Sequence, residues 1–209
     1  VRMHSEWVSR PVPVYMACTG PRSCQLAGEI ADGAIVGGVN PEKTKWHLEL
    51  IEKGALKAGR DPSEIDVWAR TLIYVAESKE VARREAASYA ATWAYDNYLA
   101  LFRRENPELV DLRRRLERVE PEIIGDLQRV YDAFDPYQHE RTDAPHAQVV
   151  TQRVIDFFLL TGTPEDICEG INKLGELGVK TVSTVLFTIF DQKGMMREIR
   201  SKIVPHFRN

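Results

Sequence analysis

Short apolar segments alternate with longer amphipathic segments along most of this chain. The segments at 14–18, 34–37, 65–75 and 181–187 are apolar or β-branched, which is typical of strands buried in a parallel sheet. Apolar residues at helical spacing predict helices over 23–31, 42–58, 80–101, 148–160, 164–177 and 195–203. Strands that alternate with helices predict an α/β fold with a parallel sheet, in the form of an open doubly wound sheet or a (β/α) barrel.

Two helix starts are especially clear in the sequence. Thr163 is suited to the N-cap position, Pro164 to the first helical position, and Glu165 and Asp166 to the positive end of the helix dipole. Asn40 predicts a second N-cap, because a proline follows it directly. We therefore expect helices to begin at 41–42 and at 164.

The first predicted strand runs directly into a turn and a helix, a pattern that can bind an anion. Gly20 allows a sharp turn and a close approach of ligand to backbone, and Pro21 suits the first turn of a helix. The amides that follow would be free at the positive helix end, where a phosphate can sit. Arg22 and Ser23 would add side-chain donors. A plain strand-to-helix connection fits the turn equally well, because the segment lacks a glycine fingerprint.

Residues 103–160 read as an insert of short helices rich in charge. Arginines at 103–104, 113–115 and 118 lie among acidic residues, which favours a solvated face with local ion pairs over a nucleic-acid patch. The loop at 135–146 follows. We therefore expect one domain over 1–209 that contains a helical insert.

Composition narrows the class of protein. A chain of 209 residues with a net charge of −3 is expected to bind neither nucleic acid nor membrane. Cys18, Cys24 and Cys168 lack metal-like spacing, so we expect reduced thiols in a cytoplasmic protein. We expect Cys18 and Cys24 to be small buried residues, although thiols of low pKa are the alternative beside an anion site.

The histidines offer few catalytic candidates. His139 and His146 could shuttle a proton near neutral pH, and Arg141 between them could hold an anionic substrate, although all three also suit a surface loop. No metal site is predicted, since the two histidines are seven residues apart without a third ligand. His47 is expected to be exposed on its helix.

Several motifs together resemble one known family. They are PVYMACTGP at 13–21, LAGEIADGAI at 26–35, KAGRDP at 57–62, TGTPED at 161–166 and LGV at 177–179. In this order they resemble the luciferase-like family of flavin- and deazaflavin-dependent oxidoreductases. Within that family they are most similar to the methylenetetrahydromethanopterin reductase-like branch.

The resemblance implies a (β/α)8 TIM barrel, of which this chain matches the C-terminal half, strands five to eight, with an insert at about 103–160. The first half of the barrel is not in this sequence. Four strands leave unpaired edges, so we expect an N-terminal half or another chain to close the barrel. Relatives of this kind often form dimers, and a homodimer is expected.

The resemblance also implies a cofactor. The loop after strand five holds the phosphate end of the cofactor in such enzymes, and here that loop consists of Ala17, Cys18, Thr19, Gly20, Pro21, Arg22 and Ser23. The implied activity is hydride transfer between coenzyme F420, a deazaflavin, and a small organic substrate. The alternatives are an FMN-dependent monooxygenase and a non-catalytic half-barrel that acts in association.

Overall fold

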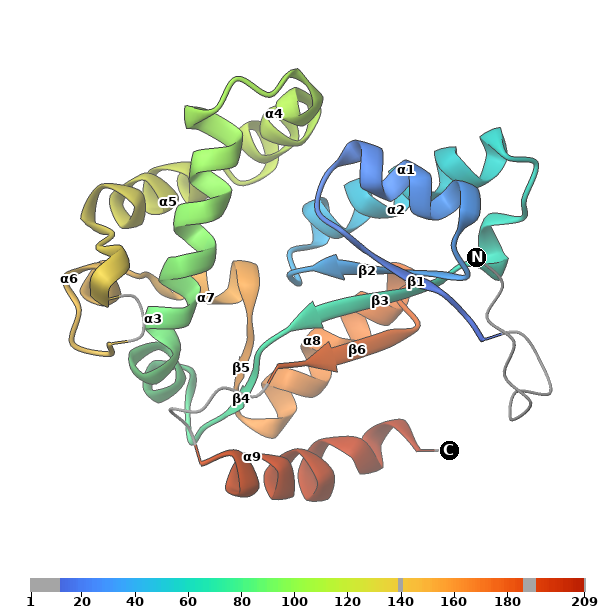
Figure 1. Ribbon diagram of the computed structural model, residues 1–209. Helices are drawn as coiled ribbons and strands as arrows, with labels where there is room; N and C mark the ends of the chain where they lie inside the picture. The colour runs from blue at the N-terminus through green and yellow to red at the C-terminus, as the bar shows by residue number, and fades with distance from the viewer. Residues whose placement is uncertain (1–11, 139–140, 186–190, 209) are drawn as a thin grey trace.

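Four parallel strands form the sheet around which the chain is arranged (Figure 1). The computed structural model describes residues 12–138, 141–185 and 191–208. The strands of the main sheet, in spatial order, are β1 (Tyr15–Cys18), β2 (Gly33–Gly37), β3 (Asp66–Thr71) and β6 (Thr181–Thr184). A second, two-stranded parallel sheet consists of β4 (Ile73–Val75) and β5 (Leu160–Gly162). The predicted α/β class with a parallel sheet is confirmed.

The helices form two groups. Those outside the helical region are α1 (Pro21–Ile30) and α2 (Pro41–Lys57), which follow β1 and β2, α8 (Pro164–Glu176), which follows β5, and α9 (Gln192–Glu198), which follows β6. Those of the helical region are α3 (Lys79–Tyr98), α4 (Val110–Val119), α5 (Pro121–Ala133), α6 (Pro145–Gln148) and α7 (Gln152–Phe158). Short 3-10 helices lie at Pro62–Glu64, Pro107–Leu109, Pro136–Gln138 and Val204–Phe207, and π-helical turns at Leu99–Arg103 and Ile199–Ile203. No helix among the described residues combines the length and the apolarity that crossing a membrane requires.

Alternate residues of the strands decide which face the helices cover. Ala34, Val36 and Val67 point to one face and pack in a buried cluster with α1 and α2. Ala69, two residues after Val67 and so on the same face of β3, packs with Val182 of β6 and with α8. The helices therefore lie on one face of the sheet, while Tyr15, Ile35 and Trp68 on the other face stay partly exposed.

The sequence patterns misplace two strands. The predicted strand over 65–75 is two strands in different sheets, because the chain bends at buried Leu72, where the Thr71 hydroxyl donates to the Phe158 carbonyl oxygen (2.8 Å). The predicted helix over 148–160 is also wrong. It begins only at Gln152, with Thr151 as N-cap, and ends at Phe158, so that Leu160–Gly162 can pair with β4.

Both predicted helix starts are confirmed. The Thr163 hydroxyl accepts the Asp166 amide (3.3 Å), and the Asp166 carboxylate accepts the Thr163 amide (3.0 Å), which is a reciprocal capping box. The Asn40 side chain accepts the Lys43 amide (3.0 Å) at the start of α2. Asn40 also donates to Glu120 (2.7 Å), so the same side chain joins α2 to the helical insert.

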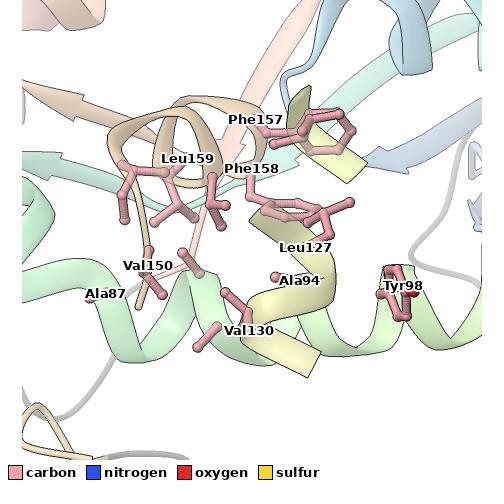
Figure 2. Packing of buried hydrophobic residues seen from close by; sticks show 14 of the residues in the cluster. Ala87, Ala94, Tyr98, Leu127, Val130, Val150, Phe157, Phe158 and Leu159 are labelled. Atoms are coloured by element: carbon pink, nitrogen blue, oxygen red, sulfur yellow. The ribbon is translucent and has the colours of Figure 1, made fainter. Parts of the chain in front are cut away.

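The helical insert packs around the alanines of α3. Figure 2 shows side chains from α3, α5 and α7 converging in one cluster, with small residues such as Ala87 and Ala94 on α3 and large ones such as Leu127 and Phe158 opposite them. Small residues on one helix allow its neighbours to approach closely. The predicted local ion pairs are confirmed on α4, where Arg115 pairs with Asp111 (3.0 Å) and with Glu49 of α2 (2.6 Å).

Two glycines allow α1 and α2 to approach each other closely. A Cβ atom on Gly28 would lie 2.0 Å from the Ile51 carbonyl oxygen, and one on Gly54 would lie 1.9 Å from the Gln25 carbonyl oxygen. Both clashes involve helix backbone, which cannot move without separating the two helices. The contact between α1 and α2 therefore requires glycine at both positions.

We expect Gly54→Ala to lower the free energy of unfolding by about 1–3 kcal/mol, because the added methyl group forces α1 away from α2. Gly175→Ala is the matched control, since a Cβ atom there meets nothing within 4 Å. This control should leave the stability unchanged or raise it by up to ~1 kcal/mol. Urea unfolding of both variants measures the difference, and equal stabilities would contradict the packing account.

Candidate functional site

A cavity of about 570 Å³ opens where the parallel strands end. Its walls include Cys18 and Thr19 at the end of β1, the glycine pair 37–38 at the end of β2, and Arg70 near the end of β3. Helices α2 and α3 supply the remaining polar side chains. Ligands of parallel α/β folds bind at the carboxyl ends of the strands, which makes this cavity the candidate site. A second groove of about 640 Å³ between β6, α8 and the C-terminal helices is mainly apolar and shares no lining residue with this cavity.

The turn between β1 and α1 presents two amides at this edge. The Ser23 hydroxyl accepts the amides of Thr19 (3.3 Å) and Gly20 (3.2 Å) and donates to the Gly20 carbonyl oxygen (2.9 Å). The amides of Arg22 and Ser23 have no acceptor in the described part of the chain. The first turn of α1 therefore offers free donors at the positive end of the helix, as an anion site requires.

Gly20 leaves open space beside the turn because it has no side chain. Its φ of −143° is extended backbone that any residue adopts, so the expectation that the turn needs glycine's freedom is wrong. A Cβ atom on Gly20 would meet nothing within 4 Å. The space beside the turn is therefore open to a ligand. The left-handed glycine of this edge is Gly38 at the exit of β2, with a φ of +89°.

The other residues predicted at the turn have distinct surroundings. Ala17 is exposed on the sheet, and Pro21 begins α1. The Arg22 guanidinium forms an ion pair with Glu108 of the insert. Cys18 is buried and donates from its thiol to the Ser23 carbonyl oxygen (3.4 Å). The hydrogen bond with Cys24 lowers the pKa of Cys18, which is the direction that the low-pKa alternative requires.

Cys24 does not fit the alternative of a low-pKa thiol. It is completely buried in the first turn of α1. The hydrogen bond with the Cys18 thiol and burial both raise the pKa of Cys24. The third cysteine, Cys168, is also a buried free thiol, and burial raises its pKa as well.

Lys43 is the unusual charged group of the cavity. Its ammonium donates to the Asn97 side-chain oxygen (2.7 Å) and lies 5.9 Å from the centre of the Phe158 ring. Asn97 is oriented by its own amide, which donates to the Trp93 carbonyl oxygen (2.8 Å). The side chain is partly exposed, and desolvation lowers the pKa of Lys43 to about 8. No carboxylate pairs with it among the described residues.

His47 lies one helical turn beyond Lys43 and lines the same cavity. Its side chain is 1% exposed, so the expectation of an exposed histidine is wrong. Neither ring nitrogen has a hydrogen-bond partner in the described ranges. Burial, with the nearby Lys43 charge, lowers the pKa of His47 to about 3, so the ring is neutral at pH 7. The sequence held a signal for this burial, because His47 lies four residues before buried Ile51 on the same helix face.

The predicted proton donors and substrate clamp do not meet at this cavity. His146 is buried in the insert against Phe134, with ring centroids 4.8 Å apart, and its Nδ1 accepts the Asp135 amide (3.3 Å). Arg141 is exposed and forms a two-point ion pair with Asp143. His139 lies outside the described residues. Across the described residues, no three His, Cys, Asp or Glu side chains gather as metal ligands would.

We expect Lys43→Met to raise the free energy of unfolding at pH 7 by about 1–3 kcal/mol, because it removes a desolvated charge. The unfolded chain, with a lysine pKa of about 10.4, binds more protons than the folded chain above the folded pKa of about 8. The free energy of unfolding of the wild-type protein therefore rises as the pH increases from about 8 to about 10.4. Over this range the difference in stability between Lys43→Met and wild type becomes smaller.

Urea unfolding at pH 7 and pH 10 measures this change. Lys45→Met, two residues further along α2 at an exposed position, is the control and should show no such pH dependence. A wild-type protein more stable than Lys43→Met at pH 7 would contradict the burial of an uncompensated charge.

Comparison with known proteins places the chain among luciferase-like enzymes. The family model described as luciferase-like monooxygenase matches residues 2–181. A 5,10-methylenetetrahydromethanopterin reductase of Methanolobus tindarius is 30% identical over 173 residues, which cover 82% of this chain and 47% of that protein. An F420-dependent hydroxymycolic acid dehydrogenase of Mycobacterium tuberculosis is 29% identical over 170 residues, covering 74% of this chain and 43% of the other.

A solved structure shows the same likeness in three dimensions. The coenzyme F420-dependent tetrahydromethanopterin reductase of Methanopyrus kandleri superposes with a TM-score of 0.72 at 25% sequence identity. The match covers 94% of this chain and 51% of the other chain. The chain thus spans about half the length of the relatives it matches.

Proposed function

We propose that this chain, which belongs to the luciferase-like monooxygenase family, carries part of the cofactor site of an oxidoreductase that uses coenzyme F420. The cavity at the strand ends, which Cys18 and Thr19 line just before the free amides of Arg22 and Ser23, is the observation that carries this proposal. Two of the relatives are named as F420-dependent, which favours a deazaflavin over FMN. The substrate of the proposed reaction is a small organic molecule.

The residues at the turn fit the phosphate of such a coenzyme. Arg22 and Ser23 would donate their amides to phosphate oxygens, and the helix dipole of α1 would favour the negative charge. Gly20 leaves open space for those oxygens, since no atom lies within 4 Å of its Cβ position. Thr19 and the glycine pair 37–38 would line the path from the phosphate toward the rest of the cavity.

When bound, a deazaflavin supplies hydride transfer to or from an organic substrate. The part of this chain is to hold and orient the coenzyme and to exclude water around it. Trp93 and Phe158 supply apolar walls of the cavity for this purpose. The described residues around the cavity include His47, whose neutral ring has one N–H at pH 7 and would not take up a second proton unless a ligand changed its surroundings.

We also propose that a complementary set of strands completes the barrel. Within the described residues, β1 and β6 each pair on one side only, and the face of the sheet that carries Tyr15 and Trp68 is partly exposed. An N-terminal half, or a second chain, would cover this face and pair with both edges. We also propose that the protein forms a homodimer and that it is cytoplasmic.

We expect Gly20→Val to raise the dissociation constant for coenzyme F420 about tenfold or more, because the valine side chain fills the space of the phosphate. The full-length protein is titrated with the coenzyme, followed by the coenzyme's fluorescence. Urea unfolding checks that the variant still folds, which is expected because a Cβ atom at position 20 meets no protein atom within 4 Å.

Gly125→Val, in α5 and outside the cavity lining, is the control and should bind the coenzyme like wild type. If Gly20→Val binds coenzyme F420 with the same dissociation constant as wild type, the phosphate does not bind at this turn. Tighter binding of FMN than of coenzyme F420 by the wild-type protein would replace the deazaflavin with a flavin. Binding of neither would leave a non-catalytic half-barrel.

A further inference from the structure

The cavity contains a positive charge that the proposed phosphate turn does not use. Lys43 lies on α2, whereas the turn belongs to β1 and α1. The Lys43 ammonium has three N–H donors, and the described residues provide one hydrogen-bond acceptor for it, the neutral Asn97 oxygen at 2.7 Å. Burying an ammonium without a negative partner is costly, so this arrangement calls for a counter-charge.

Asn97 holds its oxygen toward Lys43 by an independent contact. Its Nδ2 donates to the Trp93 carbonyl oxygen one turn earlier on α3 (2.8 Å), which fixes which end of the amide faces the ammonium. A carboxylate at position 97 would have neutralised the charge within the protein. The amide instead orients the ammonium and leaves the charge available to a ligand.

His47 gives a second and independent sign of a ligand. Its ring is 1% exposed and lines the cavity, and neither nitrogen has a partner within the described ranges. Buried polar groups in native proteins are nearly always hydrogen-bonded, so an orphaned ring at a cavity wall indicates a missing partner. The Lys43 charge acts on this ring, which places the two groups near each other.

We propose that Lys43, Asn97 and His47 form a second anion-binding subsite of the cavity, which takes a carboxylate or phosphate oxygen of the bound ligand. The ammonium supplies the charge and two free donors, Asn97 positions it, and the His47 ring donates one N–H to the same anion. Arg70, which also lines the cavity, adds positive charge to this side. Asp96 lies on the wall as well, and burial raises the pKa of its carboxyl.

The anion has two chemical sources. A deazaflavin coenzyme with an acidic tail carries a phosphate and carboxylates, and an organic substrate can carry a carboxylate of its own. The subsite uses side chains of α2 and α3, whereas the turn uses backbone amides of α1, so each is tested by its own variant. The Lys43 charge nevertheless lies close enough to act on Cys24 in the first turn of α1. Its existence is tested with inorganic phosphate, without either coenzyme or substrate.

The test follows the side-chain nitrogens of 15N-labelled lysines by NMR in the full-length protein, with the Lys43 signal assigned from Lys43→Met. Inorganic phosphate should shift the Lys43 Nζ signal and should also move the ring signals of His47. Asn97→Asp should raise the apparent dissociation constant for phosphate about tenfold or more, because the new carboxylate forms an ion pair with the Lys43 ammonium and competes with phosphate. Asn172→Asp on α8 adds the same charge away from the cavity and should leave phosphate binding unchanged.

Phosphate that leaves the Lys43 and His47 signals unmoved would overturn the subsite, and so would equal phosphate binding by wild type and Asn97→Asp. The source is distinguished by coenzyme titrations of Lys43→Met. Weaker binding of the whole coenzyme, with unchanged binding of its chromophore lacking the acidic tail, assigns the subsite to the coenzyme. Unchanged binding of both assigns it to the substrate. Gly20→Val should leave the phosphate-induced shift of Lys43 in place, so failure of the turn and failure of the subsite are told apart.

Discussion

The parallel direction of the four main strands is the constraint on which the rest of the structure depends. Parallel strands must be joined by crossovers, so β1 and β2 are each followed by a turn at the same edge and by a helix that packs on one face, whereas β3 continues into β4 before the chain reaches α3. This brings Thr19, the glycine pair 37–38 and Arg70 to one edge of the sheet, around one cavity. The crowding of α1 on α2 at Gly28 and Gly54 is the packing consequence of the same arrangement.

The polar groups of the cavity are held by helices α2 and α3 as much as by the sheet. Asn97 of α3 meets Lys43 of α2, 54 residues earlier in the chain, and the Trp93 carbonyl oxygen orients Asn97. The Asn40–Glu120 hydrogen bond joins the start of α2 to the start of α5. Asn97 of α3 and Phe158 of α7 therefore set the surroundings of the Lys43 ammonium.

The sequence predicts a helix or strand well where the signal is strong and consists of neighbouring residues, such as an N-cap followed by proline. The capping residues Thr163 and Asn40 mark their helices correctly, and the apolar run of β1 with its Gly-Pro turn places the start of α1 within two residues. The three residues of β5 carry no such signal. Their strand character comes from pairing with β4, almost ninety residues earlier, and the bend at Leu72 has the same long-range origin.

The candidate site divides in the same way. The turn could be predicted because its amides, its proline and its serine are consecutive in sequence. Lys43, His47 and Asn97 could not be assembled from sequence, because their burial depends on how α3 lies against α2. His146 shows the reverse case, since its loop position suggested chemistry whereas packing against Phe134 places it inside the insert.

We propose above that the amides at the start of α1 hold the anionic end of a deazaflavin coenzyme. Amide NMR of the full-length protein with coenzyme F420 tests it most directly. When the coenzyme binds, we expect the chemical shifts of the Arg22 and Ser23 amides to change, while the amide shifts of α5 and α8 remain the same. Coenzyme binding that leaves the Arg22 and Ser23 amides unmoved would contradict the claim.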